Sequence, residues 1–130
     1  MESFDFSDTL ANVSYNGVTG YLTMAGAISR AKPAYKPREP FIVISAMPDS
    51  SLVRNAVRAW LNDNYSDLFL RVYFVNGPEA TIPARKATVI KDTGVEAFTD
   101  NNLDILKEIK KLVPDNVKLY HFNGGERVRV

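Results

Sequence analysis

The sequence contains no cysteine and a single histidine, His121, and both scarcities limit the chemistry that one chain can perform. Without cysteine there is no disulfide framework, thiol nucleophile, cysteine-type zinc site or iron–sulfur cluster. A single histidine also excludes a multi-histidine metal site within one chain. Any hydrolytic chemistry must therefore depend on carboxylates, hydroxyls and lysines, with or without a hard metal ion.

Long apolar runs and a large excess of one charge are also absent. No segment approaches the ~20 apolar residues that cross a bilayer, and Met1-Glu2-Ser3 does not begin a secretory signal. Sixteen Lys and Arg stand against 15 Asp and Glu, which argues against a protein that mainly coats a polyanion. We expect a soluble cytoplasmic protein without a membrane partner, whose 130 residues form one domain and whose oligomeric state stays open.

The spacing of apolar residues predicts that strands and helices alternate along the chain. Strands are predicted at the N-terminus up to Phe4 and over 41–44, 68–75 and 95–99, helices over 52–61, 83–92 and 103–113, and a terminal hairpin over 117–130. This alternation is typical of βαβ units. We therefore expect a Rossmann-like, three-layer α/β/α fold with a mostly parallel sheet.

Two segments between these elements carry turn and breaker residues. Asn16-Gly17 lies between β-forming residues and predicts a short hairpin flap over about 13–24. Three prolines within about 31–40 predict an extended connector that is too short to separate two domains. The chain has no room for a large cap domain, so the flap is the only element expected to cover a site.

Polar residues stand where the predicted strands end. Asp5 follows the first strand, Ser45 closes the second, Asp100 follows the fourth, and Lys86 lies upstream of that strand. In parallel sheets, ligands bind beyond the carboxyl ends of the strands. If these side chains converge, one aspartate can be a nucleophile and another can help to hold magnesium, while the hydroxyl and the ammonium bind phosphate oxygens.

Four motifs in this order resemble those of the haloacid dehalogenase-like superfamily, whose commonest members are magnesium-dependent phosphatases. Asp5-Phe6-Ser7-Asp8-Thr9 is similar to the first motif, Asp-x-Asp-x-Thr, and Ser45 to the second, a Ser or Thr that ends a strand. The basic third motif is matched by Lys86, with Arg85 and Lys91 as alternatives. Asp100 and Asp104 resemble the acidic pair of the fourth motif.

The resemblance implies a phosphatase that works through an aspartyl-phosphate on a phosphorylated nucleotide, a nucleic-acid end or another phosphate ester. Asp5 would be the nucleophile, and its second oxygen, the Ser7 carbonyl and Asp100 would bind Mg²⁺, with Asp104 as a further ligand. Thr9 and Ser45 would orient the phosphoryl group, and Lys86 would offset its charge. Capless members of the family often act on large or polymeric substrates.

Two departures from the family pattern support an alternative function. Ser7 replaces the aspartate that protonates the leaving group and later activates water, a contribution of typically ~10²–10⁴-fold. Asn101 stands where a second acid would follow Asp100, and Asp8 replaces a glycine. The alternative is a catalytically degenerate domain that binds a protein or a nucleic acid.

Simpler interpretations of the same residues also stay open. Asp5 could be a turn carboxylate, Asp100 an ordinary helix cap, Asp104 a residue that stabilises a helix N-terminus, and Lys86 a solvated lysine. His121 is expected to be structural and Trp60 to lie in the core. A basic surface for nucleic acid could combine Lys107, Lys110, Lys111, Arg54, Arg58, Arg127 and Arg129.

Overall fold

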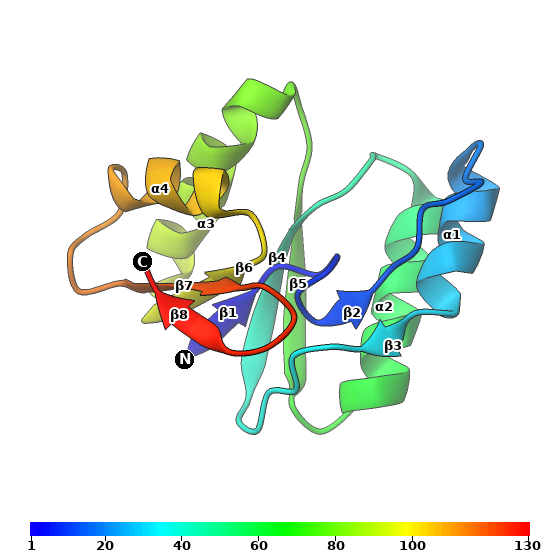
Figure 1. Ribbon diagram of the computed structural model, residues 1–130, viewed down its shortest axis with the longest axis horizontal. Helices are drawn as coiled ribbons and strands as arrows, with labels where there is room; N and C mark the ends of the chain where they lie inside the picture. The colour runs from blue at the N-terminus through cyan, green and yellow to red at the C-terminus, as the bar shows by residue number, and fades with distance from the viewer.

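A six-stranded, mostly parallel sheet forms the centre of the computed structural model, which describes residues 1–130 (Figure 1). Its spatial order is β5-β4-β1-β6-β7-β8, and only β8 runs antiparallel to its neighbour. The predicted mostly parallel sheet is thereby confirmed. The strands are β1 (Glu2–Phe4), β4 (Phe41–Ala46), β5 (Phe69–Val75), β6 (Ala97–Asp100), β7 (Lys118–Phe122) and β8 (Arg127–Arg129).

Helices cover both faces of this sheet. Figure 1 shows α1 and α2 together on one side and α3 and α4 on the other, so the fold is a layered α/β structure consistent with the Rossmann-like class. None of the helices has the length and apolar character needed to cross a membrane. The helices are α1 (Tyr21–Ser29), α2 (Ser51–Tyr65), α3 (Ile82–Thr93) and α4 (Leu103–Lys110), and a 3₁₀ turn spans Glu79–Thr81.

Helix α2 begins and packs as its sequence pattern indicates. The Ser50 hydroxyl caps the helix by accepting from the Val53 amide (3.5 Å). On the buried face, the Trp60 ring packs edge-on against Phe6, with ring centroids 5.3 Å apart. Its indole N–H donates to the Ala31 carbonyl (2.8 Å), so this one side chain joins the helix, the loop that follows β1 and the connector.

On the other face of the sheet, α3 and α4 bury a second apolar cluster. Gly94 ends α3 in the left-handed conformation (φ 68°), which glycine adopts without strain. The cluster includes Ile42, Ile44, Ala87, Ile90, Phe98, Leu106, Ile109 and Leu119. Because both faces of the sheet are covered, the central strand β4 is apolar except for Ser45.

The predicted hairpin flap over about 13–24 is wrong. The turn itself forms, and the Val18 amide donates to the Tyr15 carbonyl (3.2 Å). No second strand follows, because the Gly20 amide donates to the Thr23 hydroxyl (3.1 Å) and starts α1 at Tyr21. The flap is therefore a loop followed by a helix, since a local capping bond competes with strand pairing.

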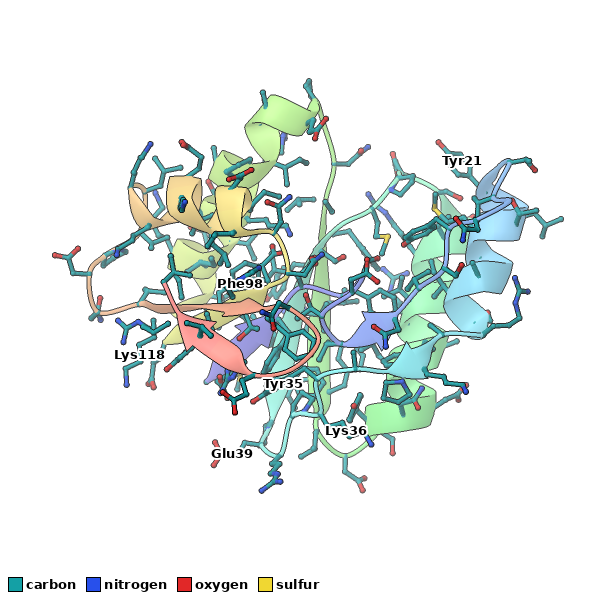
Figure 2. The ribbon with its side chains drawn as sticks, in the orientation of Figure 1. Tyr21, Tyr35, Lys36, Glu39, Phe98 and Lys118 are labelled. Atoms are coloured by element: carbon teal, nitrogen blue, oxygen red, sulfur yellow. The ribbon has the colours of Figure 1, made fainter.

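A small antiparallel ribbon of β2 (Ala11–Asn12) and β3 (Lys32–Pro33) closes this loop-and-helix segment at its base. Beyond β3, the extended connector donates its Tyr35 amide to the Thr9 carbonyl (2.9 Å). The Tyr35 ring lies beside the hairpin of β7 and β8 (Figure 2), 5.6 Å from the Phe122 ring. The connector therefore braces the loop that follows β1.

The basic residues proposed as one nucleic-acid surface lie apart. Arg54 and Arg58 of α2 both stack over Phe74 of β5, which is one edge strand of the sheet. Arg127 and Arg129 belong to β8, the opposite edge strand. The structure therefore divides these four arginines between the two edges of the sheet, and Lys110 of α4 lines one hollow with Arg129.

Trp60→Phe should lower the free energy of unfolding by about 1–3 kcal/mol, because the Ala31 carbonyl loses its donor and the smaller ring leaves a void. Urea unfolding followed by circular dichroism measures the change. The exposed Leu52 on the same helix provides a control, since Leu52→Ala should change stability by less than about 0.5 kcal/mol. Equal losses of stability in the two variants would contradict the buried position and the hydrogen bond assigned to Trp60.

Candidate active site

Register in the sheet brings Asp5 and Asp100 side by side. Phe4 pairs with Thr99 across β1 and β6, and the Asp5 amide donates to the Thr99 carbonyl (2.9 Å) beyond the last pair. On the other side of β1, Phe4 pairs with Val43, two residues before Ser45. The three strands that end in Asp5, Ser45 and Asp100 are therefore adjacent, with the Asp5 strand in the middle.

Lys86 of α3 joins the two aspartates. Its ammonium donates to Asp5 Oδ1 (3.1 Å) and Asp100 Oδ2 (2.8 Å), and the residue is only 2% exposed. The two alternatives to Lys86, Arg85 and Lys91, do not contact the aspartates. Arg85 donates to the Thr81 hydroxyl (2.9 Å), and Lys91 is exposed in the last turn of α3.

This buried cluster contains two acids and one base, so one negative charge is left over when both acids ionise. Burial raises the pKa of Asp5 from 3.8 to about 7, the charge of Asp100 adds to the shift, and Lys86 opposes it. For Lys86, burial lowers the pKa, but the two carboxylates outweigh burial and raise it to about 12. Lys86 therefore stays charged at neutral pH, and the cluster attracts one more positive charge.

A tight loop follows Asp5 and directs the next residues. The Phe6 carbonyl accepts from the amides of Leu10 (3.0 Å) and Ala11 (3.1 Å), which folds the chain back on itself. Asp8 takes the left-handed conformation (φ 58°) and is exposed. That conformation suits glycine, which is the residue usual at this place in the family that the motif resembles.

Ser7 faces the loop that replaces the predicted hairpin. Its hydroxyl lies 2.7 Å from the Tyr15 hydroxyl. Burial raises the pKa of Tyr15 above 10.0, the hydrogen bond to Ser7 opposes the shift, and the charges of Asp8 and Asp5 add to it. Ser7 and Tyr15 therefore form a neutral hydroxyl pair beside the charged cluster.

The side-chain amide of Asn101 lies among three oxygens of the site. With its nitrogen turned inward, Asn101 donates to Asp100 Oδ1 (3.1 Å), Asp5 Oδ2 (3.2 Å) and the Ser7 carbonyl (3.2 Å). The backbone carbonyl of Asn101 is held 3.0 Å from Nε2 of His121 on β7. Three acceptors thus converge on one point at the end of β6.

The two remaining hydroxyls of the predicted site are buried. Thr9 is 0% exposed, and its hydroxyl has no hydrogen-bond partner. Ser45 is 1% exposed and is the next-to-last residue of β4. Both lie at the carboxyl edge of the sheet, but access of a substrate to Thr9 would require the surrounding loop to shift.

Asp104 does not join this cluster. It is exposed in the first turn of α4 and lines a separate hollow with Pro83 and Glu108. Asn102, not Asp100, caps α4, because its side-chain oxygen accepts from the Ile105 amide (3.1 Å). No group of three or more His, Cys, Asp or Glu side chains is placed to hold a metal ion.

Sequence reasoning missed what Tyr15 contributes and where the Asn101 amide lies, because loop geometry brings each to its partner and spacing in the sequence carries no signal for it. His121 was expected to be structural, and its contact with the Asn101 backbone agrees with that expectation. Comparison with known proteins gives no further guide, because no family model, curated protein or solved structure matches this chain.

Lys86→Met should lower the free energy of unfolding by about 3–5 kcal/mol at neutral pH, because two buried carboxylates lose their only cation. Urea unfolding measures the loss. Lys91→Met, on the exposed side of the same helix, is the matched control and should change stability by less than about 0.5 kcal/mol. A similar value for both variants would contradict the buried ion-pair assignment.

Asp5→Asn should be more stable than the wild type at about pH 8 and lose this advantage toward pH 5. The folded-state pKa of Asp5, about 7, exceeds its ordinary value of 3.8, so its contribution to stability is lost as pH rises through about 7. Asparagine does not titrate and removes this pH dependence. Urea unfolding at both pH values measures the difference in stability. A variant less stable than the wild type at the higher pH would contradict the raised pKa of Asp5.

Proposed function

We propose that this protein is a magnesium-dependent phosphohydrolase of the haloacid dehalogenase-like type, with Asp5 as its nucleophile. The observation that carries the proposal is the Lys86 ammonium, buried between Asp5 (3.1 Å) and Asp100 (2.8 Å) at the carboxyl edge of adjacent parallel strands. Phosphoryl transfer chiefly needs an aligned nucleophile and neutralised charge. This cluster supplies both.

The two oxygens of Asp5 have different surroundings. Oδ1 accepts from Lys86, and Oδ2 faces the Asn101 amide, Asp100 and the Ser7 carbonyl. We assign Oδ1 to attack on phosphorus, because the adjacent ammonium can then also neutralise the phosphoryl oxygens. Ser45, buried near the end of β4, would orient the phosphoryl group, and so would Thr9 once the loop that buries it shifts.

The oxygens around Asn101 fit a hard divalent cation. If the amide oxygen turns inward, four oxygens from Asp5, Ser7, Asp100 and Asn101 face one another, with Asn101 3.1–3.2 Å from the other three. Neighbouring ligand oxygens of Mg²⁺ lie about 3 Å apart, given metal–oxygen distances of about 2.1 Å. When bound, the ion would neutralise charge on the phosphoryl group and orient it.

The Asn101 amide can serve the site in both of its orientations. With nitrogen inward it offers two hydrogens to three acceptors, and Asp100 Oδ1 also accepts from the Asn102 backbone amide (3.0 Å). With oxygen inward it is a neutral ligand that completes the set. Asparagine therefore stabilises the facing carboxylates without a cation and binds a cation without adding charge.

Charge near the site favours a small phosphorylated substrate over a polyanionic chain. A hollow of about 430 Å³ lies beyond the ends of β4 and β5; no side chain of the Asp5 cluster lines it, and its lining includes Ala46, which follows Ser45, together with Tyr21, Asp49 and Glu79. Tyr21 stands at the outer end of α1 (Figure 2). Two carboxylates at this hollow disfavour a polyanionic chain, and the basic residues of α2 and β8 lie at opposite edges of the sheet.

Asp5→Asn should lower the Mg²⁺-dependent hydrolysis of para-nitrophenyl phosphate by at least about 1,000-fold, because the nucleophile is removed. Phosphate release measures activity, and circular dichroism checks the fold. Asp104→Asn is the matched control, since that carboxylate lies outside the cluster, and its activity should stay unchanged.

Unchanged turnover in Asp5→Asn would exclude Asp5 as the nucleophile. No turnover of a broad panel of phosphate esters and acyl phosphates, together with no rise in melting temperature with Mg²⁺, would instead favour the binding-module alternative. Ser7 is the residue that motivates this alternative, because it provides no proton transfer.

Asn101→Asp should tighten Mg²⁺ binding about tenfold or more at pH 8, because it adds a negative charge to a cluster that already lacks one cation. The midpoint of the Mg²⁺-induced rise in melting temperature measures affinity. Asn102→Asp changes the neighbouring, exposed helix cap and is the control. Equal midpoints for both variants would contradict the placement of the ion beside Asn101.

A further inference from the structure

The position two residues after the nucleophile holds no acid or base. Ser7 presents a hydroxyl, and that hydroxyl is bonded to a second hydroxyl, of Tyr15, at 2.7 Å. Efficient proton transfer needs a group whose pKa lies near the working pH. A pair of neutral hydroxyls provides a hydrogen bond but no such group.

The other titratable groups near Asp5 are already engaged or turned outward. Lys86 and Asp100 bind each other, and the Asn101 carbonyl occupies Nε2 of His121. Asp8 is exposed and in a left-handed turn. The site therefore contains the groups that we propose to bind a phosphoryl group, but it contains no group placed to transfer a proton.

The two halves of the reaction need a proton to different extents. In the first, Asp5 Oδ1 forms a bond to phosphorus while the bond from phosphorus to the donor oxygen breaks, and the donor leaves with that electron pair. An alkoxide needs a proton at this moment, but a carboxylate, whose conjugate acid has a pKa near 4, leaves as a stable anion. The first half thus proceeds without an acid only when the donor carries a good leaving group, as an acyl phosphate does and as the artificial ester para-nitrophenyl phosphate does.

The second half needs a base whatever the donor was. Water adds to phosphorus, the bond between phosphorus and Asp5 breaks, and the aspartate carboxylate is regenerated as phosphate leaves. The attacking water must give up a proton, and neither Ser7 nor Tyr15 is placed as a base to take it. Hydrolysis therefore becomes the slow step, and the aspartyl-phosphate persists.

We infer that this protein takes its phosphoryl group from a small acyl phosphate and holds it on Asp5 as a long-lived phosphoenzyme. Transfer between two carboxylates exchanges one acyl phosphate for another, so the phosphorylated state can be highly populated. This inference rests on the proposed function, and it names the substrate class and the slow step of the same site.

The test uses acetyl phosphate and Mg²⁺ with the full chain, followed by intact-mass spectrometry and peptide mapping. The wild type should gain one phosphoryl group on Asp5, and Asp5→Asn should gain none. After donor removal, Ser7→Asp should lose the group about 100-fold faster or more, because it restores a base. Asp8→Asn is the control, and its phosphoenzyme should last as long as that of the wild type.

Each remaining outcome has a distinct meaning. Rapid multiple turnover by the wild type with no phosphoenzyme would overturn the inference and leave the proposed function intact. Neither label nor turnover in the wild type and Ser7→Asp would overturn the proposed function as well. A longer-lived phosphoenzyme in Asp8→Asn would identify Asp8 as a base and overturn the inference. If Ser7→Asp does not fold, the wild-type lifetime and the Asp8→Asn comparison still decide.

Discussion

The contact of Lys86 with Asp5 and Asp100 is the interaction on which the rest of the site depends. Its ammonium is almost fully buried and lies 3.1 and 2.8 Å from the two carboxylates. Two acids so close in a dry environment could not both stay ionised without it. Lys86 thereby holds in place the ends of β1 and β6, and it couples helix α3 to both.

The same cluster costs the folded protein stability at higher pH. Burial, with the charge of Asp100 added to it, raises the pKa of Asp5 to about 7, so the ionised form that the proposed reaction needs is also the less stable one. A bound cation would relieve this repulsion. The Asn101 amide provides partial relief through hydrogen bonds to the same oxygens, and His121 holds the backbone of Asn101 in position.

Much of this arrangement could be predicted from the chain alone. Apolar spacing located α2 and the strands that precede Asp5, Ser45 and Asp100, and the rule that ligands lie beyond strand ends selected these residues. The hairpin over about 13–24 failed because Thr23 supplies a local helix cap that outcompetes strand pairing. Asp104 was placed by its spacing from Asp100, but α4 turns it outward because the apolar stripe of that helix must face the sheet.

The sequence by itself determined the chemistry that is possible: without cysteine and with one histidine, only carboxylates, hydroxyls and lysines could form a site. It also determined the order of strands and helices, because periodicity is a local property of the chain. Only the tertiary structure decided which of Arg85, Lys86 and Lys91 meets the aspartates, and that Tyr15 meets Ser7. Lys86 and Asp5 are 81 positions apart, so their contact depends on helix rotation and strand register, which are set by packing of the whole core, and Tyr15 meets Ser7 through the fold of the loop between them.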